Sequence, residues 1–372
     1  MAYTTVNPKA HFDVQTYTGS GSTKTISGVG FKPDLVWTKD RTVANDWGCY
    51  DSSRGVQKWL KLNETESQNN AGDITATTTS LASFTSDGFT ISTMGTTEPV
   101  GNVASSEFLT YMWKANGASL TTSNAGAVGS IASVYQANTT SKVSVIQYTG
   151  TGTAGTLAHG LGAVPKFIMV KRLNAVEGWQ IYHGSKTINA NPETDYYELN
   201  TNAGFTDNAN RWNDTAPTST VFSIGTHAGL NTSGSTYVAY VFAENQGFQA
   251  FGAYTGVSNN ADGPMIYTGF RPSLVIIKRS DGAESWQVAN TAAAQIKSDG
   301  SQGIQGNMTE QKLVANLPTA ENSTGGDLDI YSNGFKLRDT DGIHNWTDYE
   351  YIYMAWAEAS VVGTNGQIAN AY

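Results

Sequence analysis

The sequence predicts an all-β protein built from three tandem antiparallel β-sandwich modules of the jelly-roll or lectin-like kind. Two observations predict this class. Glycine occurs 39 times and aromatic residues make up 11% of a chain with only 14% charged residues, a mixture typical of many short strands joined by tight turns. A pattern of proline, lysine and tryptophan at fixed spacing also occurs three times, and such a repeat indicates repeated structural units.

The repeat opens with Tyr-Thr-Gly at 17–19, 148–150 and 254–256. In the segment that follows, a proline stands six residues before a lysine and fourteen before a tryptophan in every copy. Because the anchors keep one spacing, we predict that they hold equivalent structural positions and that the prolines and tryptophans serve the core. The three sets are Pro33, Lys39 and Trp47; Pro165, Lys171 and Trp179; and Pro272, Lys278 and Trp286.

Each proline is expected to open a strand, at a position where a ladder N–H is dispensable. The apolar residues behind it, as in 274–277, show no alternation, which indicates a strand covered on both faces. The lysine that ends this run is expected to return the chain to solvent. Asp-Gly at 87–88 and Asn-Gly at 333–334 predict tight hairpin turns in the first and third copies, whereas the second copy has Val-Phe-Ser-Ile at 221–224.

Each copy closes with an aromatic strand, at 108–113, 237–244 and 351–358. Both alternating faces of this strand are apolar, so one face fills the module's core. The other face is expected to be covered by a neighbouring module or subunit, which favours self-association into a homo-oligomer.

These patterns divide the chain into a first module with an N-terminal arm at 1–116, a second module at 143–246 and a third at 247–359. The segment 117–142 is rich in Gly, Ala, Ser, Thr and Asn and is interpreted as a linker. Residues 360–372 form a C-terminal tail. No insert separates the second and third modules, so we expect these two to keep a fixed orientation.

Composition excludes several classes of partner and cofactor. A net charge of −9 and a pI near 5.0 argue against nucleic acid and anionic membranes, and no apolar run is long enough to span a bilayer. The single cysteine, Cys49, is predicted to be a buried thiol. The histidines lack metal-ligand spacing and Asp-Thr-Asp-Gly at 339–342 supplies only half of a calcium loop, so we predict no metal and no cofactor.

Trp212 and Trp346 lie in polar, turn-like segments just before closing strands. An exposed indole stacks on the apolar face of a sugar ring, and the neighbouring Asn213 and Asp214 would bind its hydroxyl groups. These four residues are the predicted ligand-binding positions. No catalytic residue is predicted, because no nucleophile motif occurs and carboxylates do not fall at matching positions of the three copies.

The whole set of motifs resembles repeats in structural proteins of marine bacteriophages. The resemblance is carried by Tyr-Thr-Gly, by Gly-Phe-x-Pro-x-Leu-Val-x-x-Lys at 30–39, by Tyr-Val-Ala-Tyr-x-Phe-Ala-Glu at 237–244 and by Met-Ala-Tyr-Thr-Thr at 1–5. It extends over nearly all of the chain except 117–142 and the tail. It implies a place on the virion surface, in a tail fibre, a head fibre or a capsid decoration, with capsid or tail proteins as partners.

The leading hypothesis is therefore a non-enzymatic virion surface protein that contacts the host through its aromatic loops. We expect it to form a homo-oligomer, a trimer by analogy with phage fibres. The alternative is a carbohydrate-binding module array that recognises host glycans. A polysaccharide depolymerase is a third hypothesis.

Overall fold

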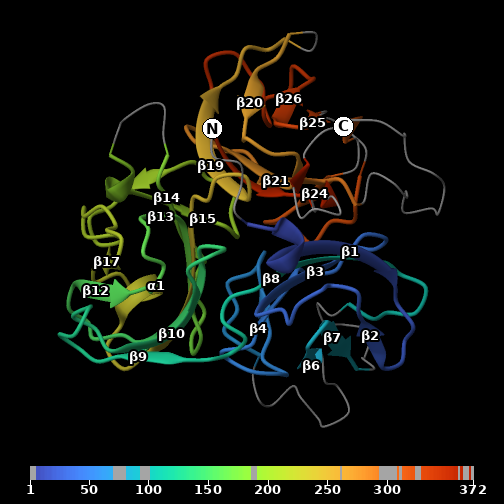
Figure 1. Cartoon of the computed structure of the whole chain (residues 1–372). Helices are drawn as coiled ribbons and strands as arrows, with labels where there is room; N and C mark the ends of the chain where they lie inside the picture. Colours follow the sequence, from blue (N-terminus) through green and yellow to red (C-terminus); the bar gives the residue numbers. More distant parts are fainter. Residues whose placement is uncertain are drawn as a thin grey trace.

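The computed structural model describes residues 6–69, 81–92, 101–185, 191–259, 262–292, 308–309, 312–322, 328–358, 361–362 and 368–369. Its elements are antiparallel strands with one short α-helix and two 3-10 turns, which confirms the all-β prediction. Figure 1 shows three lobes around a common centre, coloured blue, green, and orange to red along the chain. Within the described residues, no helix is long and apolar enough to cross a membrane.

The first module, the blue lobe, pairs a large sheet of order β1-β8-β3-β4-β5 with a small sheet of order β2-β7-β6. The closing strand β8 lies between the Tyr-Thr-Gly strand β1 and the Pro-led strand β3. The 3-10 turn η1 at Pro8–Ala10 comes first. The strands are β1 Phe12–Thr18, β2 Lys24–Ile26, β3 Leu35–Asp40, β4 Gly48–Asp51, β5 Leu60–Lys61, β6 Leu81–Thr85, β7 Gly88–Ile91 and β8 Glu107–Trp113.

The second module has a large sheet of order β16-β15-β14-β13-β18-β11-β10-β9 and a small sheet of β12 and β17. Its closing strand β18 again lies between the Tyr-Thr-Gly strand β11 and the Pro-led strand β13. The elements are β9 Thr121–Ser123, β10 Ser133–Asn138, β11 Val143–Thr149, β12 Gly155–Ala158, β13 Pro165–Arg172, β14 Gln180–His183, η2 Pro192–Thr194, β15 Asp195–Glu198, β16 Thr206–Asp207, β17 Val221–Ile224, α1 Ala228–Asn231 and β18 Thr236–Ala243.

The prediction that 117–142 is a linker is wrong. The strands β9 and β10 lie inside this segment, and β10 pairs with β11 over its whole length, from Ser133 opposite Tyr148 to Asn138 opposite Val143. The segment was misinterpreted because its overall composition is rich in Gly and Ser, although Val134 and Tyr135 favour a strand. By extending the sheet, β10 satisfies backbone groups that β11 would otherwise expose as an edge.

The third module has a large sheet of order β19-β27-β21-β22-β24 and a small sheet of order β20-β26-β25-β23. The two predicted hairpin turns are confirmed, because Thr85 pairs with Gly88 and Tyr331 with Gly334. In the predicted tail, β28 pairs with β29. The strands are β19 Gln249–Thr255, β20 Met265–Tyr267, β21 Pro272–Arg279, β22 Gln287–Asn290, β23 Met308–Thr309, β24 Lys312–Val314, β25 Leu328–Tyr331, β26 Gly334–Leu337, β27 Glu350–Ala357, β28 Val361–Val362 and β29 Ile368–Ala369.

Each module has its own apolar core between its two sheets. In β21, Val275 and Ile277 belong to this inner core, whereas Leu274 and Ile276 belong to a different cluster on the opposite face. The prediction of a strand covered on both faces is therefore confirmed. The three repeat prolines are buried. Pro165 and Pro272 open their strands at a register shift, as expected of a residue without an N–H.

The cluster on the opposite face joins all three modules. The outer faces of the large sheets pack against one another, so the second face of every closing strand is covered by neighbouring modules of the same chain. At the centre lie Trp113, Phe242 and Trp356, which hold equivalent positions on β8, β18 and β27, with ring centroids 5.5–6.1 Å apart. The aromatic face that favoured self-association is thus buried within one chain, and it no longer argues for a homo-oligomer.

The second and third modules are joined by a tight connection, as predicted. The side-chain amide nitrogen of Gln249 lies within hydrogen-bond distance of the carbonyl oxygens of Ser141, Lys142 and Ala243. Its amide oxygen accepts the indole N–H of Trp356 at 3.0 Å. One buried glutamine at the start of β19 therefore ties the end of β18, the start of β11 and the central aromatic cluster together.

Candidate functional site

The repeat tryptophans lie at the joints between modules. Each ring is buried, and each indole N–H donates to a backbone carbonyl of another module, at 2.8–3.3 Å: Trp47 to Val314, Trp179 to Lys61 and Trp286 to Glu198. The acceptors end the equivalent strands β24, β5 and β15. The first module thus contacts the third, the second contacts the first and the third contacts the second, so three similar head-to-tail joints close a ring.

The prediction that these tryptophans serve a repeated core is confirmed by their burial, and the structure places that core between modules. Sequence reasoning missed a set of asparagines that supports them. The main-chain N–H of each tryptophan donates to the side-chain oxygen of Asn63, Asn200 or Asn316. These asparagines follow their tryptophans by 16, 21 and 30 residues, so no constant spacing identifies them.

The repeat lysines are buried at the same joints. The expectation that they return the chain to solvent is therefore wrong. Backbone carbonyl oxygens from two modules surround each ammonium group, and these dipoles compensate for its removal from water. Lys39 donates to the carbonyls of Asp40, Asn45 and Pro318, Lys171 to those of Glu64 and Glu177, and Lys278 to those of Asn202, Arg279 and Gly282.

A main-chain hydrogen bond between modules also occurs at an equivalent position of each joint. Two residues after each lysine, the carbonyls of Arg41, Leu173 and Ser280 accept N–H groups of Glu321, Gln68 and Phe205 at 2.8–3.0 Å. At the joint of the first and third modules, Arg41 also forms a fully buried ion pair with Glu321. Each joint therefore combines an indole, an ammonium group and a backbone link.

Burial lowers the pKa of Lys39 and Lys171 to about 8 and that of Lys278 to about 7, because desolvation disfavours the charged form. In the unfolded chain their pKa is about 10.4. Between about pH 7 and about pH 10 the unfolded chain therefore binds more protons than the folded chain. The free energy of unfolding should rise with pH across this window, by up to about 1.4 kcal/mol per pH unit for each lysine.

Urea unfolding at pH 6, 7, 8 and 9 measures this rise. Lys278→Met should show a shallower rise than the wild type, since one titrating group is removed. Below about pH 6 these lysines are charged in both states and should contribute no slope. A wild-type profile that is flat from pH 7 to 9 would mean instead that the carbonyl oxygens keep all three ammonium groups protonated.

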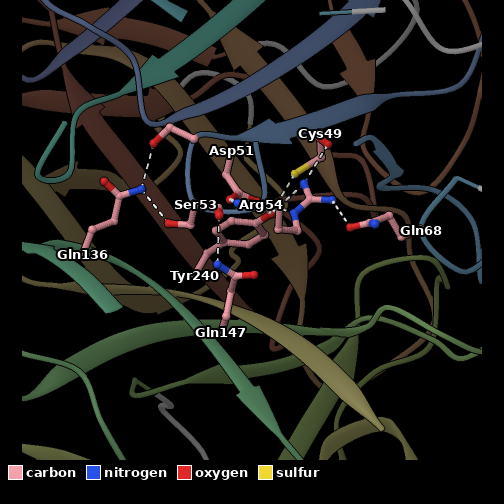
Figure 2. A network of polar contacts seen from close by, with 9 residues as sticks. Cys49, Asp51, Ser53, Arg54, Gln68, Gln136, Gln147 and Tyr240 are labelled. Atoms are coloured by element: carbon pink, nitrogen blue, oxygen red, sulfur yellow. Dashed lines mark hydrogen bonds and ion pairs between the residues drawn. The ribbon is translucent and has the colours of Figure 1, made fainter. Parts of the chain in front are cut away.

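The joint of the first and second modules holds the polar network of Figure 2. The Arg54 guanidinium pairs with Asp51, and the Tyr240 hydroxyl of β18 donates to the same Asp51 carboxylate at 2.7 Å. Arg54 also donates to the Tyr240 oxygen and to the carbonyl of Cys49 at 3.2 Å. A charged pair from one module is thus completed by a phenol from the next.

Two glutamines widen this network. Gln136 of β10 donates to the hydroxyls of Ser52 and Ser53, and Gln147 of β11 donates to the Ser53 carbonyl. The segment 117–142, first interpreted as a linker, therefore supplies a residue of this joint.

The Cys49 thiol is buried beside Tyr240, as predicted. Burial raises the pKa of this thiol to about 12, which makes it a poor nucleophile.

Trp212 is not an exposed contact residue, and this prediction is wrong. Its ring is 2% exposed and packs edge-to-face on Tyr182 in the inner core of the second module. The two residues that follow, Asn213 and Asp214, have positive φ angles of 56° and 43°. This turn leaves the polar neighbours exposed while the indole points inward. Polar flanking residues suggested exposure of the whole segment, but only the turn itself is exposed.

Trp346 is the predicted stacking tryptophan that remains at the surface, with 48% of its area exposed. It lies in the loop 339–349, called here the tryptophan loop. Its ring leans on that of Tyr349, with centroids 6.3 Å apart, and the Arg279 guanidinium lies 3.4 Å from the centre of the Tyr349 ring. Asp281 pairs with Arg279 at 2.8 Å. The structure therefore separates Trp346 from the other predicted binding residues, which lie in the second module.

A buried asparagine holds the tryptophan loop in place. Asn345 donates to the carbonyls of Asn259 and Asp339 and accepts the N–H of Val257. Equivalent asparagines in the other modules bind the loops that follow their Tyr-Thr-Gly strands. All three stand six residues before the first aromatic of the closing strand, a constant spacing in the sequence that could have identified them: Asn102 and Phe108, Asn231 and Tyr237, and Asn345 and Tyr351.

The half calcium loop is accounted for by local hydrogen bonding. The Asp341 side chain accepts the N–H of Ile343, and its carbonyl accepts the N–H of Asn345, which is a turn rather than a cation cage. Among the described residues, no cluster of His, Cys, Asp or Glu side chains has the arrangement of a metal site.

Fold and joints together define a single-chain ring of three β-sandwich modules linked head to tail. The family model described as "Domain of unknown function (DUF7483)" matches residues 7–360, which span all three modules. The chain therefore belongs to the DUF7483 family. No curated protein matches the sequence.

One solved structure, titled "Crystal Structure of the STIV MCP", is similar over 64% of this chain and 90% of that chain, with 9% identity and a TM-score of 0.15. A TM-score this low carries no argument about fold or function.

Proposed function

We propose that this chain is a non-enzymatic surface component of a bacteriophage virion, a fibre, a spike or a capsid decoration, bound to capsid or tail proteins. The observation that supports the non-enzymatic part of the proposal is how the chain uses its buried polar groups. The three lysines, the Arg54–Asp51 pair and the Arg41–Glu321 pair all bridge modules. Groups whose burial could prepare them for catalysis serve instead to rigidify the ring.

A rigid ring suits a protein that presents surfaces rather than turning over a substrate. Three equivalent joints fix three sandwiches relative to one another, so loops from different modules keep a constant relative geometry. The resemblance to repeats of marine phage structural proteins supports the same function, and the family match over the entire ring indicates that the three modules occur as one unit.

Labelling of purified virions tests the proposal. An antibody raised against the folded chain should decorate intact particles of the phage that encodes it, and electron microscopy then places the label on head or tail. Mass spectrometry of the same particles should detect the chain. Its absence from purified virions, while it is present in the infected-cell lysate, would contradict a virion location, and release of reducing sugar from host polysaccharide would contradict the non-enzymatic function.

A further inference from the structure

The tryptophan loop departs from the repeat in a way that the fold does not require. In all three modules an equivalent asparagine holds the loop before the closing strand. In the second and third modules, the main-chain N–H of the residue after this asparagine donates to the hydroxyl of a closing-strand tyrosine: Thr232 to Tyr237, and Trp346 to Tyr351. At the position of Trp346 the first and second modules have Val103 and Thr232. The repeat therefore accounts for the conformation of the loop, but it does not account for the tryptophan at this position.

The loop is held in position before any ligand binds. The Tyr351 hydroxyl accepts the N–H of Trp346 and donates to the Gly342 carbonyl, the Tyr254 hydroxyl donates to the His344 carbonyl, and Ser258 accepts the N–H of Thr347 at 2.7 Å. A side chain displayed on such a loop loses little conformational freedom on binding. The Trp346 ring is 48% exposed on this support and lies beside the partly exposed ring of Tyr349, with centroids 6.3 Å apart. The loop therefore displays two neighbouring aromatic rings in a fixed position.

The surroundings of the indole select the ligand. The Arg279 charge is neutralised by Asp281. The tryptophan loop itself carries the exposed Asp348, two residues after Trp346, and the partly exposed Asp341, five residues before it. A side chain placed on Gly342 would approach the Glu284 carboxylate within 3.6 Å. These groups repel phosphates and acidic sugars, and they accept hydrogen bonds from hydroxyl and amide N–H donors.

We propose that the tryptophan loop binds an uncharged sugar ring, whose apolar C–H face stacks on Trp346 while its hydroxyl groups donate to the neighbouring carboxylates. This site rests on the proposed function and deepens it, because it would let a virion protein attach to a neutral glycan of the host surface. One site replaces the expected array, since Trp212 is buried.

A protein partner fits the loop less well. In the two segments that Asn345 ties together, the tryptophan loop and 257–259, Trp346 and Val257 are the large apolar side chains exposed among the described residues. A stable protein interface needs roughly 800 Å² from each partner with an apolar centre, whereas one indole face suffices for a single sugar ring.

The experiment uses the full chain on a printed array of oligosaccharides built from neutral hexoses, deoxyhexoses and N-acetylhexosamines, beside acidic ones with uronic or sialic acids. Binding is expected among the uncharged members only. For the strongest of these, Trp346→Ala should weaken binding about tenfold or more, the effect of losing one aromatic stack, whereas Trp346→Tyr should retain most of it. Tyr267→Ala is the matched control, because Tyr267 is 71% exposed in the same module and should leave binding unchanged.

Binding of acidic glycans alone, no glycan binding at all, or full binding by Trp346→Ala would each overturn the site. So would a Trp346→Ala chain that keeps glycan binding but loses a virion protein, since that result assigns the loop to a protein partner. Virion labelling is a separate readout. Labelled virions without glycan binding reject the sugar site alone, and glycan binding by a chain that purified virions lack rejects the virion location alone.

Discussion

Trp113→Ala is expected to lower the free energy of unfolding by about 3–5 kcal/mol. The Trp113 ring is fully buried at the centre of the molecule. It lies 5.5 Å from the ring of Trp356 in the third module and 6.1 Å from that of Phe242 in the second. Truncation to alanine leaves a cavity that borders all three modules, and the packed strands around it cannot collapse freely to fill it.

Urea unfolding measured by tryptophan fluorescence and by circular dichroism tests this expectation. Because the cavity borders every module, the variant should unfold in one transition that moves to lower urea for both probes. Trp346→Ala is the control, since its ring is exposed and its removal should change stability by about 0.5 kcal/mol or less. A second transition in Trp113→Ala, with two modules keeping wild-type stability, would show that the modules unfold independently.

The repeat made most of the fold predictable. Fixed spacing from proline to tryptophan located β3, β13 and β21, the closing aromatic segments located β8, β18 and β27, and the Asp-Gly and Asn-Gly turns located two hairpins. These predictions succeed because they depend on local physics: a proline without an N–H, an apolar run, a tight turn. The asparagine at constant spacing before the closing strand was equally accessible.

The sequence could not predict which module surfaces pack against one another. The pattern of β27 shows two apolar faces, but it does not say whether another module or another chain covers the outer one. Burial of Lys278 contradicts the usual exposure of lysine, and it depends on carbonyl oxygens of Asn202 and Gly282 that only the assembled ring brings together. The orientation of Trp212 likewise depends on two positive φ angles that no apolar pattern encodes.

The polar network at the joint of the first and second modules gives the second large effect on stability. Arg54→Met is expected to destabilise the chain by about 3–5 kcal/mol, because it leaves the Asp51 carboxylate buried without its cation. Both side chains are almost completely buried, at 1% and 0% exposure. The remaining donor from the second module, the Tyr240 hydroxyl, neutralises no charge. Asp51→Asn combined with Arg54→Met should recover part of the loss, since the uncompensated charge is then gone.

A double-mutant cycle at pH 7 separates the ion pair from the packing of the arginine stem. Lys336→Met provides the contrast, because Lys336 pairs with Asp262 at 3.3 Å where the aspartate is 86% exposed, and such a pair contributes about 1 kcal/mol or less. If Arg54→Met cost no more than Lys336→Met, the network would be dispensable for stability. In that case the joint of the first and second modules would be held by the Trp179 indole and the apolar cluster, and the polar groups would fix only its register.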